Sequence, residues 1–143
     1  MFWRLLMCCL LAGGIDFSWQ ASAQEKPKAE GQSSAMTATI AGQETYRSYC
    51  ASCHGLDAKG NGPAASALKK APADLTFLAK KSGGKFPAAR VSSIIRGNDF
   101  IVDHGLQGMP VWGNAFRAAN HDETMVELKI RNLTVYLRSV QQK

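Results

Sequence analysis

The sequence lacks an apolar run long enough to cross a membrane. Its most apolar stretch, Leu5 to Ile15, has eleven residues, whereas a transmembrane helix needs about 20. Arg4 precedes this stretch and the small residues Ala21-Ser22-Ala23 follow it, which is the pattern of a secretory signal peptide. We therefore expect residues 1–23 to be a cleaved export signal that leaves no stable membrane insertion. An uncleaved anchor is the alternative.

Strand-type alternation of polar and apolar residues is also absent, and no internal repeat is visible. These two absences exclude sheet-rich folds and repeat arrays. A chain of 143 residues has room for one ordinary domain. Residues 24–40 are polar, contain proline and glycine and show no sustained period, so we expect a flexible leader there. The folded domain is then expected to cover residues 41–143.

Acidic residues are fewer than basic ones, 11 against 17, which gives a net charge of +6. A basic surface favours encounter with acidic partners through long-range attraction. Nucleic acid is a poor candidate because the lysines lie in separate pairs, such as Lys69-Lys70 and Lys80-Lys81, without a basic helix or interleaved aromatics. We expect a protein partner and no nucleic acid.

Cysteines are scarce, and two of the four lie within the expected signal. The other two stand in Cys50-Ala51-Ser52-Cys53-His54, a C-x-x-C-H motif. This motif indicates covalent attachment of a c-type haem, because both thiols lie on one helical turn and the imidazole that follows can ligate iron. It occurs once, so one haem is expected. A thiol oxidoreductase would need a βαβ pattern, and structural zinc would need a fourth ligand.

Helical spacing of apolar residues recurs in four segments, 42–53, 74–82, 87–96 and 122–140. Asp74 and Asp122 are expected to cap the second and fourth segments. The last one carries the clearest apolar stripe, made of Val126, Ile130, Leu133, Leu137 and Val140. Residues 56–72 and 98–120 are rich in glycine and proline and are expected to be loops. The predicted fold class is all-α, with four to five short helices and long loops.

A second axial ligand for the iron is expected from Met109. It lies in the segment 107–112, where the neighbouring glycine and proline favour an extended loop. His104 is the rival, and ligation by two histidines would lower the reduction potential. Met36 lies in the expected leader, and Met125 lies in the first turn of the last helix, where we expect it to pack.

The chain resembles the class I, monohaem cytochromes c of the bacterial periplasmic type over about residues 41–141. Four pieces in order carry the resemblance: Gly42-x-x-x-Tyr46-x-x-x-Cys50-Ala-Ser-Cys53-His54-Gly55, Gly60-Asn61-Gly62-Pro63, Gly108-Met109-Pro110-Val111-Trp112-Gly113, and Leu133-x-x-Tyr136. The resemblance implies a small cytochrome c fold wrapped around one haem c. It also implies that residues 41–143 form a cytochrome c domain.

The resemblance further assigns roles to single residues. Cys50 and Cys53 would attach the haem, and His54 and Met109 would ligate its iron. The carbonyl of Pro63 would accept a hydrogen bond from the ring of His54. The remaining roles are structural: Gly42 and Tyr46 would cross the last helix against Leu133 and Tyr136, Trp112 would contact the haem or simply pack, and the haem would be walled by Phe77, Leu78, Val91, Ile94 and Ile95.

The function implied by the resemblance is periplasmic electron transfer by one haem that cycles between Fe(II) and Fe(III). The protein would then be an electron carrier with a redox donor and a redox acceptor, and not an enzyme. It would be a monomer or part of a redox complex. The alternative is a tightly bound haem c subunit of a larger dehydrogenase or terminal oxidase. A haem enzyme, such as a peroxidase or a gas-binding cytochrome, would need an open sixth position on the iron.

Overall fold

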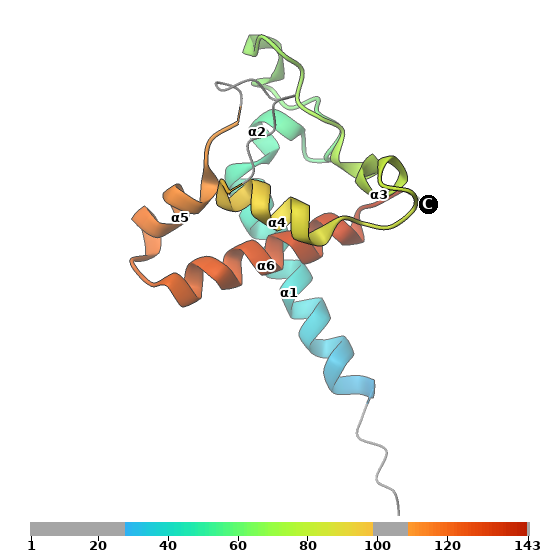
Figure 1. The fold of residues 1–143 in the computed structure, drawn as a ribbon, viewed down its shortest axis with the longest axis vertical. Coiled ribbons are helices and arrows are strands. Elements are labelled where there is room, and N and C mark those ends of the chain that lie inside the picture. Colours follow the sequence, from blue (N-terminus) through green and yellow to red (C-terminus); the bar gives the residue numbers. More distant parts are fainter. Residues whose placement is uncertain (1–27, 99–108, 143) are drawn as a thin grey trace, which may run out of the picture.

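The computed structural model describes residues 28–98 and 109–142, and these residues are helical without any strand (Figure 1). The elements in chain order are α1 (Lys28–Tyr49), α2 (Ala51–His54), η1 (Ala65–Ala67), η2 (Leu75–Phe77), α3 (Leu78–Lys81), α4 (Ala88–Arg96), α5 (Trp112–Asn120) and α6 (Glu123–Ser139). The all-α prediction is confirmed, although the described residues form six α-helices where four to five were expected. None of these helices is long and apolar enough to span a membrane. The expected signal at 1–23 and the rival ligand His104 lie outside the described residues.

The crossing of α1 and α6 organises the fold (Figure 1), and Gly42 of α1 lies against Asn132 and Tyr136 of α6. A Cβ atom on Gly42 would lie 2.0 Å from the carbonyl oxygen of Asn132, so only glycine allows the two backbones to approach this closely. One turn further along each helix, the rings of Tyr46 and Tyr136 are 5.2 Å apart, and Leu133 is fully buried. The contact predicted from the resemblance is confirmed.

Helix α6 begins where the sequence predicts. The side chain of Asp122 accepts a hydrogen bond of 2.8 Å from the backbone N–H of Thr124, which caps the first turn. Four residues of the predicted stripe are buried and form the centre of the core: Val126, Ile130, Leu133 and Leu137. Met125 is 43% exposed, so the expectation that it packs is wrong.

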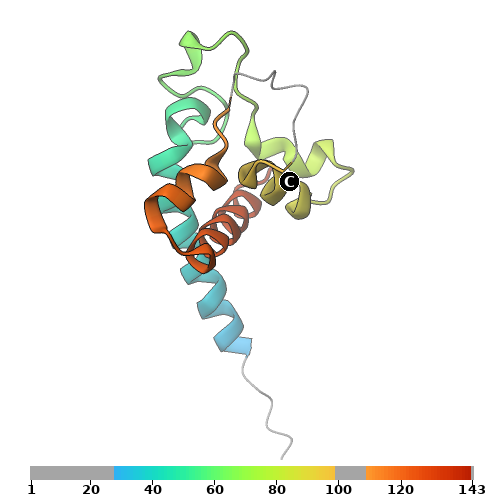
Figure 2. The same ribbon diagram turned by 60° about the vertical axis from the view of Figure 1, so that its left-hand side comes forward.

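The expectation of a flexible leader over residues 24–40 is wrong for residues 28–40, which are the first part of α1. This half of α1 projects away from the remaining helices (Figure 2). Residues 31–37 are exposed, and side-chain bonds such as Thr37 Oγ1 to the Ser33 carbonyl (3.0 Å) follow the helix. Because residues 31–37 have no buried face, their sequence has no apolar period. Extending a helix that is already packed needs no new nucleus.

Helix α5 was predicted to be part of a loop. Gly113 looks like a helix breaker, but it lies inside α5. A glycine is needed at this position because a Cβ atom would come within 2.5 Å of the Arg96 carbonyl oxygen at the end of α4. Phe116, one turn later, is fully buried. A glycine that serves a close backbone contact is indistinguishable in sequence from one that ends a helix.

The two middle helical segments agree with the prediction. Asp74 accepts a hydrogen bond of 2.8 Å from the backbone N–H of Thr76 and caps η2, which leads into α3. Helix α4 buries Val91 and Ile95 and ends at Gly97, whose φ of 90° is left-handed. Residues from α4 and from the η2–α3 turn line one cavity together with His54 of α2.

Candidate functional site

The two thiols and the imidazole of the C-x-x-C-H motif lie on one turn at the junction of α1 and α2. Cys50 is the residue between the helices, and the backbone N–H groups of Cys53 and His54 both bond to its carbonyl, at 3.2 Å and 2.9 Å. Cys50 and His54 are each 8% exposed, and Cys53 is half-buried. Both cysteines are free thiols in this structure. The arrangement presents two sulfurs and one imidazole from a single turn, as the sequence predicts.

Burial raises the pKa of the Cys50 thiol to about 12, and the neighbouring Cys53 adds a smaller effect in the same direction. A thiol with such a pKa is protonated at neutral pH. Thiol-exchange enzymes work the other way, since they lower the pKa of the attacking thiol to obtain a thiolate. The electrostatics of Cys50 therefore disfavour the thiol oxidoreductase alternative.

The ring of His54 is oriented by a backbone carbonyl from the loop that follows it. Its Nδ1 atom lies 3.0 Å from the carbonyl oxygen of Ala73. When Nδ1 carries the proton it donates to this carbonyl, and the lone pair is then on Nε2, where it can ligate a metal. Two backbone bonds of 2.8 Å bring the loop back, one from Gly60 N–H to the His54 carbonyl and one from Leu75 N–H to the Ala58 carbonyl.

The assignment of this hydrogen bond to the Pro63 carbonyl is corrected by the structure, because the carbonyl of Ala73 stands at Nδ1. Pro63 is exposed, and its two neighbours bond through their backbone N–H groups to carbonyls of α2. Gly62 N–H bonds to the Cys53 carbonyl at 3.0 Å, and Ala64 N–H bonds to the Ser52 carbonyl at 2.8 Å.

Two cavities share Cys50, His54 and Met109 in their walls. The second cavity is lined by apolar side chains from four parts of the chain, including Leu78, Val91, Ile94, Ile95, Leu133 and Leu137. Four of the five residues predicted to wall a macrocycle are therefore in place. The fifth, Phe77, lies under the ammonium group of Lys80, which is 5.8 Å from its ring centre.

The first cavity is bordered by residues that the sequence analysis did not assign to the site: Tyr49, Leu68, Lys70, Pro72 and Pro110. Trp112, for which contact or packing was expected, also lines it. The ring of Tyr49 packs edge-on against Trp112 at 5.5 Å and against Phe116 at 5.1 Å. Lys129 caps this group, with its ammonium 5.9 Å from the Tyr49 ring centre. The one signal for Tyr49 was its place directly before Cys50.

The residues around these cavities fit a haem. Thiols from Cys50 and Cys53 reach the edge of the space, and the imidazole of His54 and the thioether of Met109 both border it. Nearly all remaining wall atoms are apolar, which suits the faces of a porphyrin. The donor set of one imidazole and one thioether is one that cytochromes c use for iron.

A sequence model of the family described as cytochrome c oxidase, cbb3-type, subunit III matches residues 37–127, which is more than half of the chain. The match includes the C-x-x-C-H turn, Met109 and the whole of α2 to α5. Comparisons with curated proteins and with solved structures found no match. The family carries haem c bonded to its cysteines, and the free thiols of Cys50 and Cys53 have the spacing for this bond. This chain belongs to that family, and it is a monohaem c-type cytochrome that transfers electrons through haem iron.

Proposed function

We propose that His54 and Met109 are the two axial ligands of the haem iron, and that the protein is a one-electron carrier of the periplasm. The observation that supports this is the shared wall: both side chains border both cavities, next to the attachment thiol of Cys50. Cys50 and Cys53 bind the haem, and the export signal predicted for residues 1–23 supplies the route to the periplasm.

The haem supplies the Fe(II)/Fe(III) couple, and the chain supplies the surroundings that set its behaviour. The carbonyl of Ala73 fixes the plane of the His54 ring through Nδ1. The thioether of Met109 is a neutral ligand, which favours a high reduction potential. Leu133 and Leu137 of α6 exclude water from the inner side of the site. With both axial positions held by the protein, no site for a substrate is left, so the protein is a carrier and not a catalyst.

The donor and acceptor are proposed to carry acidic docking surfaces. The net charge of +6 favours such partners, and Lys70 borders the first cavity while Lys69 beside it is exposed. Interfaces between redox partners are typically small and short-lived. Reduction by an acidic partner should slow as ionic strength rises, because salt screens exposed charges beyond a Debye length of about 8 Å at physiological salt. If the rate of reduction did not depend on salt concentration, the basic surface would have no role in docking the partner.

The second candidate function is a stable haem c subunit of a larger dehydrogenase or terminal oxidase. The description of the matched family favours it, since it names an oxidase subunit. Purification from the native membrane and periplasmic fractions under mild conditions separates the two functions. A carrier elutes alone at the size of a single processed chain, below the 15.5 kDa of the full polypeptide, whereas a subunit elutes with its partner enzyme at constant stoichiometry through successive columns.

The axial ligands are tested on the oxidised holoprotein, by following the weak near-infrared band of a thioether bound to ferric haem. Met109→Ala should abolish this band. Met125→Ala is the matched control, because Met125 is an exposed methionine outside the cavity walls. Loss of the native spectrum in His104→Ala, with retention in Met109→Ala, would transfer the role to the histidine. Rapid binding of carbon monoxide by the native reduced protein would reject ligation by both side chains.

Localisation is tested by haem staining of cell fractions and by intact mass. The proposal expects the stained band in the periplasmic fraction, with the mass of residues 24–143 plus one haem. A band confined to the membrane pellet, with the mass of the full chain, would support the retained anchor instead.

A further inference from the structure

The end of α4 and the start of α5 are pressed together backbone to backbone. A Cβ atom on Gly113 would lie 2.5 Å from the carbonyl oxygen of Arg96. A second close contact lies beside it, because a Cβ atom on Gly97 would lie 2.2 Å from the side-chain atom Cγ1 of Val111. We call this pair of contacts, made by residues 96–97 and 111–113, the two-glycine clamp.

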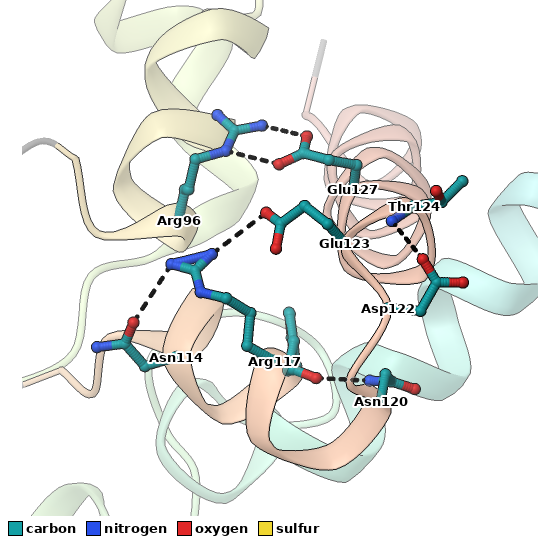
Figure 3. A network of polar contacts seen from close by, with 9 residues as sticks. Arg96, Asn114, Arg117, Asn120, Asp122, Glu123, Thr124 and Glu127 are labelled. Carbon is teal, nitrogen blue, oxygen red and sulfur yellow. Dashed lines mark hydrogen bonds and ion pairs between the residues drawn. The ribbon is translucent and has the colours of Figure 1, made fainter.

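Ion pairs tie both sides of the two-glycine clamp to α6. The guanidinium of Arg96 binds Glu127 with two hydrogen bonds, of which Nε to Oε1 measures 2.9 Å (Figure 3). Arg117 of α5 reaches Glu123 at 3.4 Å and Asn114 at 3.3 Å (Figure 3). α4 and α5 are therefore attached to the same helix that forms the floor of the site with Leu133 and Leu137.

Met109 is close to this clamp along the chain. It is two residues before Val111, so its Cα atom lies within about 7 Å of the Val111 Cα atom. The intervening Pro110 has a fixed φ, which removes one of the few rotations that could absorb a shift of Val111. A displacement of the two-glycine clamp therefore shifts Met109, whose side chain borders both cavities.

We propose that Gly97 and Gly113 are positioning residues for the thioether of Met109. Their missing side chains let the ends of α4 and α5 meet, and this meeting places the sulfur at the sixth position of the haem iron. The inference rests on the proposed ligation by Met109 and adds the reason why the thioether stays bound. Neither glycine touches the haem cavities, so both act through the backbone.

The geometry sets the size of the effect. Ordinary contacts of a Cβ atom begin at 3.4 Å, so alanine at position 113 forces a retreat of about 0.9 Å (3.4 minus 2.5) from a backbone atom that no rotamer can move. Alanine at position 97 meets a side-chain methyl group at 2.2 Å. A misplacement of 1 Å at a reacting centre can change a rate by a factor of about a hundred.

The experiment measures imidazole binding to the ferric holoprotein, because imidazole competes with the thioether for iron. Gly97→Ala and Gly113→Ala should each bind imidazole at least tenfold more tightly than the parent and should weaken the thioether band. Gly84→Ala is the control for the first, since Gly84 has φ of 89° against 90° for Gly97 and nothing within 4 Å. Gly31→Ala is the control for the second, since Gly31 is helical with nothing within 4 Å. Both controls should keep the parent affinity.

A second substitution separates the contact from general damage. In Gly97→Ala the clash is with Cγ1 of Val111, so adding Val111→Ala should return the imidazole affinity to within threefold of Val111→Ala alone. In Gly113→Ala the clash is with the Arg96 carbonyl, and Val111→Ala should not rescue it. If Gly97→Ala accumulates without haem, recovery of holoprotein in the double variant supports the clamp, and no recovery overturns it.

The outcomes distinguish this inference from the proposed ligation. If Met109→Ala keeps the thioether band, the ligation itself is wrong. If Met109→Ala loses the band while both clamp variants bind imidazole no more tightly than their controls, Met109 is the ligand and the clamp inference is overturned. A loss of thermal stability in the clamp variants without a change in imidazole affinity also overturns it, because that result is a structural effect alone.

Discussion

Replacing Gly42 by alanine tests the helix crossing that organises the domain. The new Cβ atom would lie 2.0 Å from the Asn132 carbonyl oxygen, 2.6 Å from its carbonyl carbon and 2.8 Å from Cβ of Tyr136. Ordinary contact begins at 3.4 Å, so the helices must separate by about 1.4 Å (3.4 minus 2.0). Because these atoms belong to backbone or to a Cβ, no rotamer change relieves the contact. Overpacking of this kind costs about 1–3 kcal/mol, and alanine regains at most about 1 kcal/mol in helix propensity.

Gly31→Ala is the matched control, because Gly31 lies in the same helix with nothing within 4 Å. It should stabilise the protein by about 0.5–1 kcal/mol, the ordinary gain from glycine to alanine in a helix. The assay is guanidinium denaturation of the two holoproteins, followed by circular dichroism. We expect Gly42→Ala to unfold with a free energy about 2 kcal/mol below that of Gly31→Ala. Equal midpoints and equal slopes for the two variants would refute the crossing at Gly42.

Three further predictions concern the site and its supports. Tyr46→Phe removes a buried hydrogen bond of 2.7 Å from the tyrosine hydroxyl to the Gly55 carbonyl, and should lower the free energy of unfolding by about 1–3 kcal/mol; an unchanged denaturation midpoint would contradict it. The bond from Arg96 holds the pKa of Glu127 below its ordinary value of 4.5, so the pair stabilises the fold above pH 4.5 and loses this effect as the pH falls below it. Glu127→Gln should therefore cost more stability at pH 6 than at pH 3, by less than about 1 kcal/mol because the pair is exposed; an equal cost at both values would count against the ion pair. Replacing both Cys50 and Cys53 by serine should abolish haem staining on a denaturing gel, and a stained band of full intensity would show attachment elsewhere.

Much of the fold could be predicted from local patterns in the single sequence. Asp74 and Asp122 were identified as helix caps because the side chain and the capped N–H are only two residues apart. The α6 stripe was identified because one buried face repeats over several turns. The errors arose where no local pattern exists. Residues 31–37 of α1 have no buried face, and Gly113 makes a close contact with another helix.

In the candidate site too, the residues that are close in sequence were predictable and the contact from a distant loop was not. Cys50, Cys53 and His54 lie on one turn, so their spacing alone predicted how they are grouped. The carbonyl that faces His54 belongs to Ala73, and a backbone carbonyl has no sequence signature because every residue has one. The family resemblance placed this bond at Pro63. The path of the loop between residues 60 and 75 determines which carbonyl faces His54, and that path depends on hydrogen bonds between distant backbone groups.

Helix α1 joins its exposed first half to the attachment turn without a break. Its 22 residues form a rod of about 33 Å, at 1.5 Å per residue. A partner that bound the outer end of this helix would therefore fix both the distance and the orientation of Cys50 at the inner end. The part of the helix that contributes least to the core would then set the direction in which the redox centre faces such a partner.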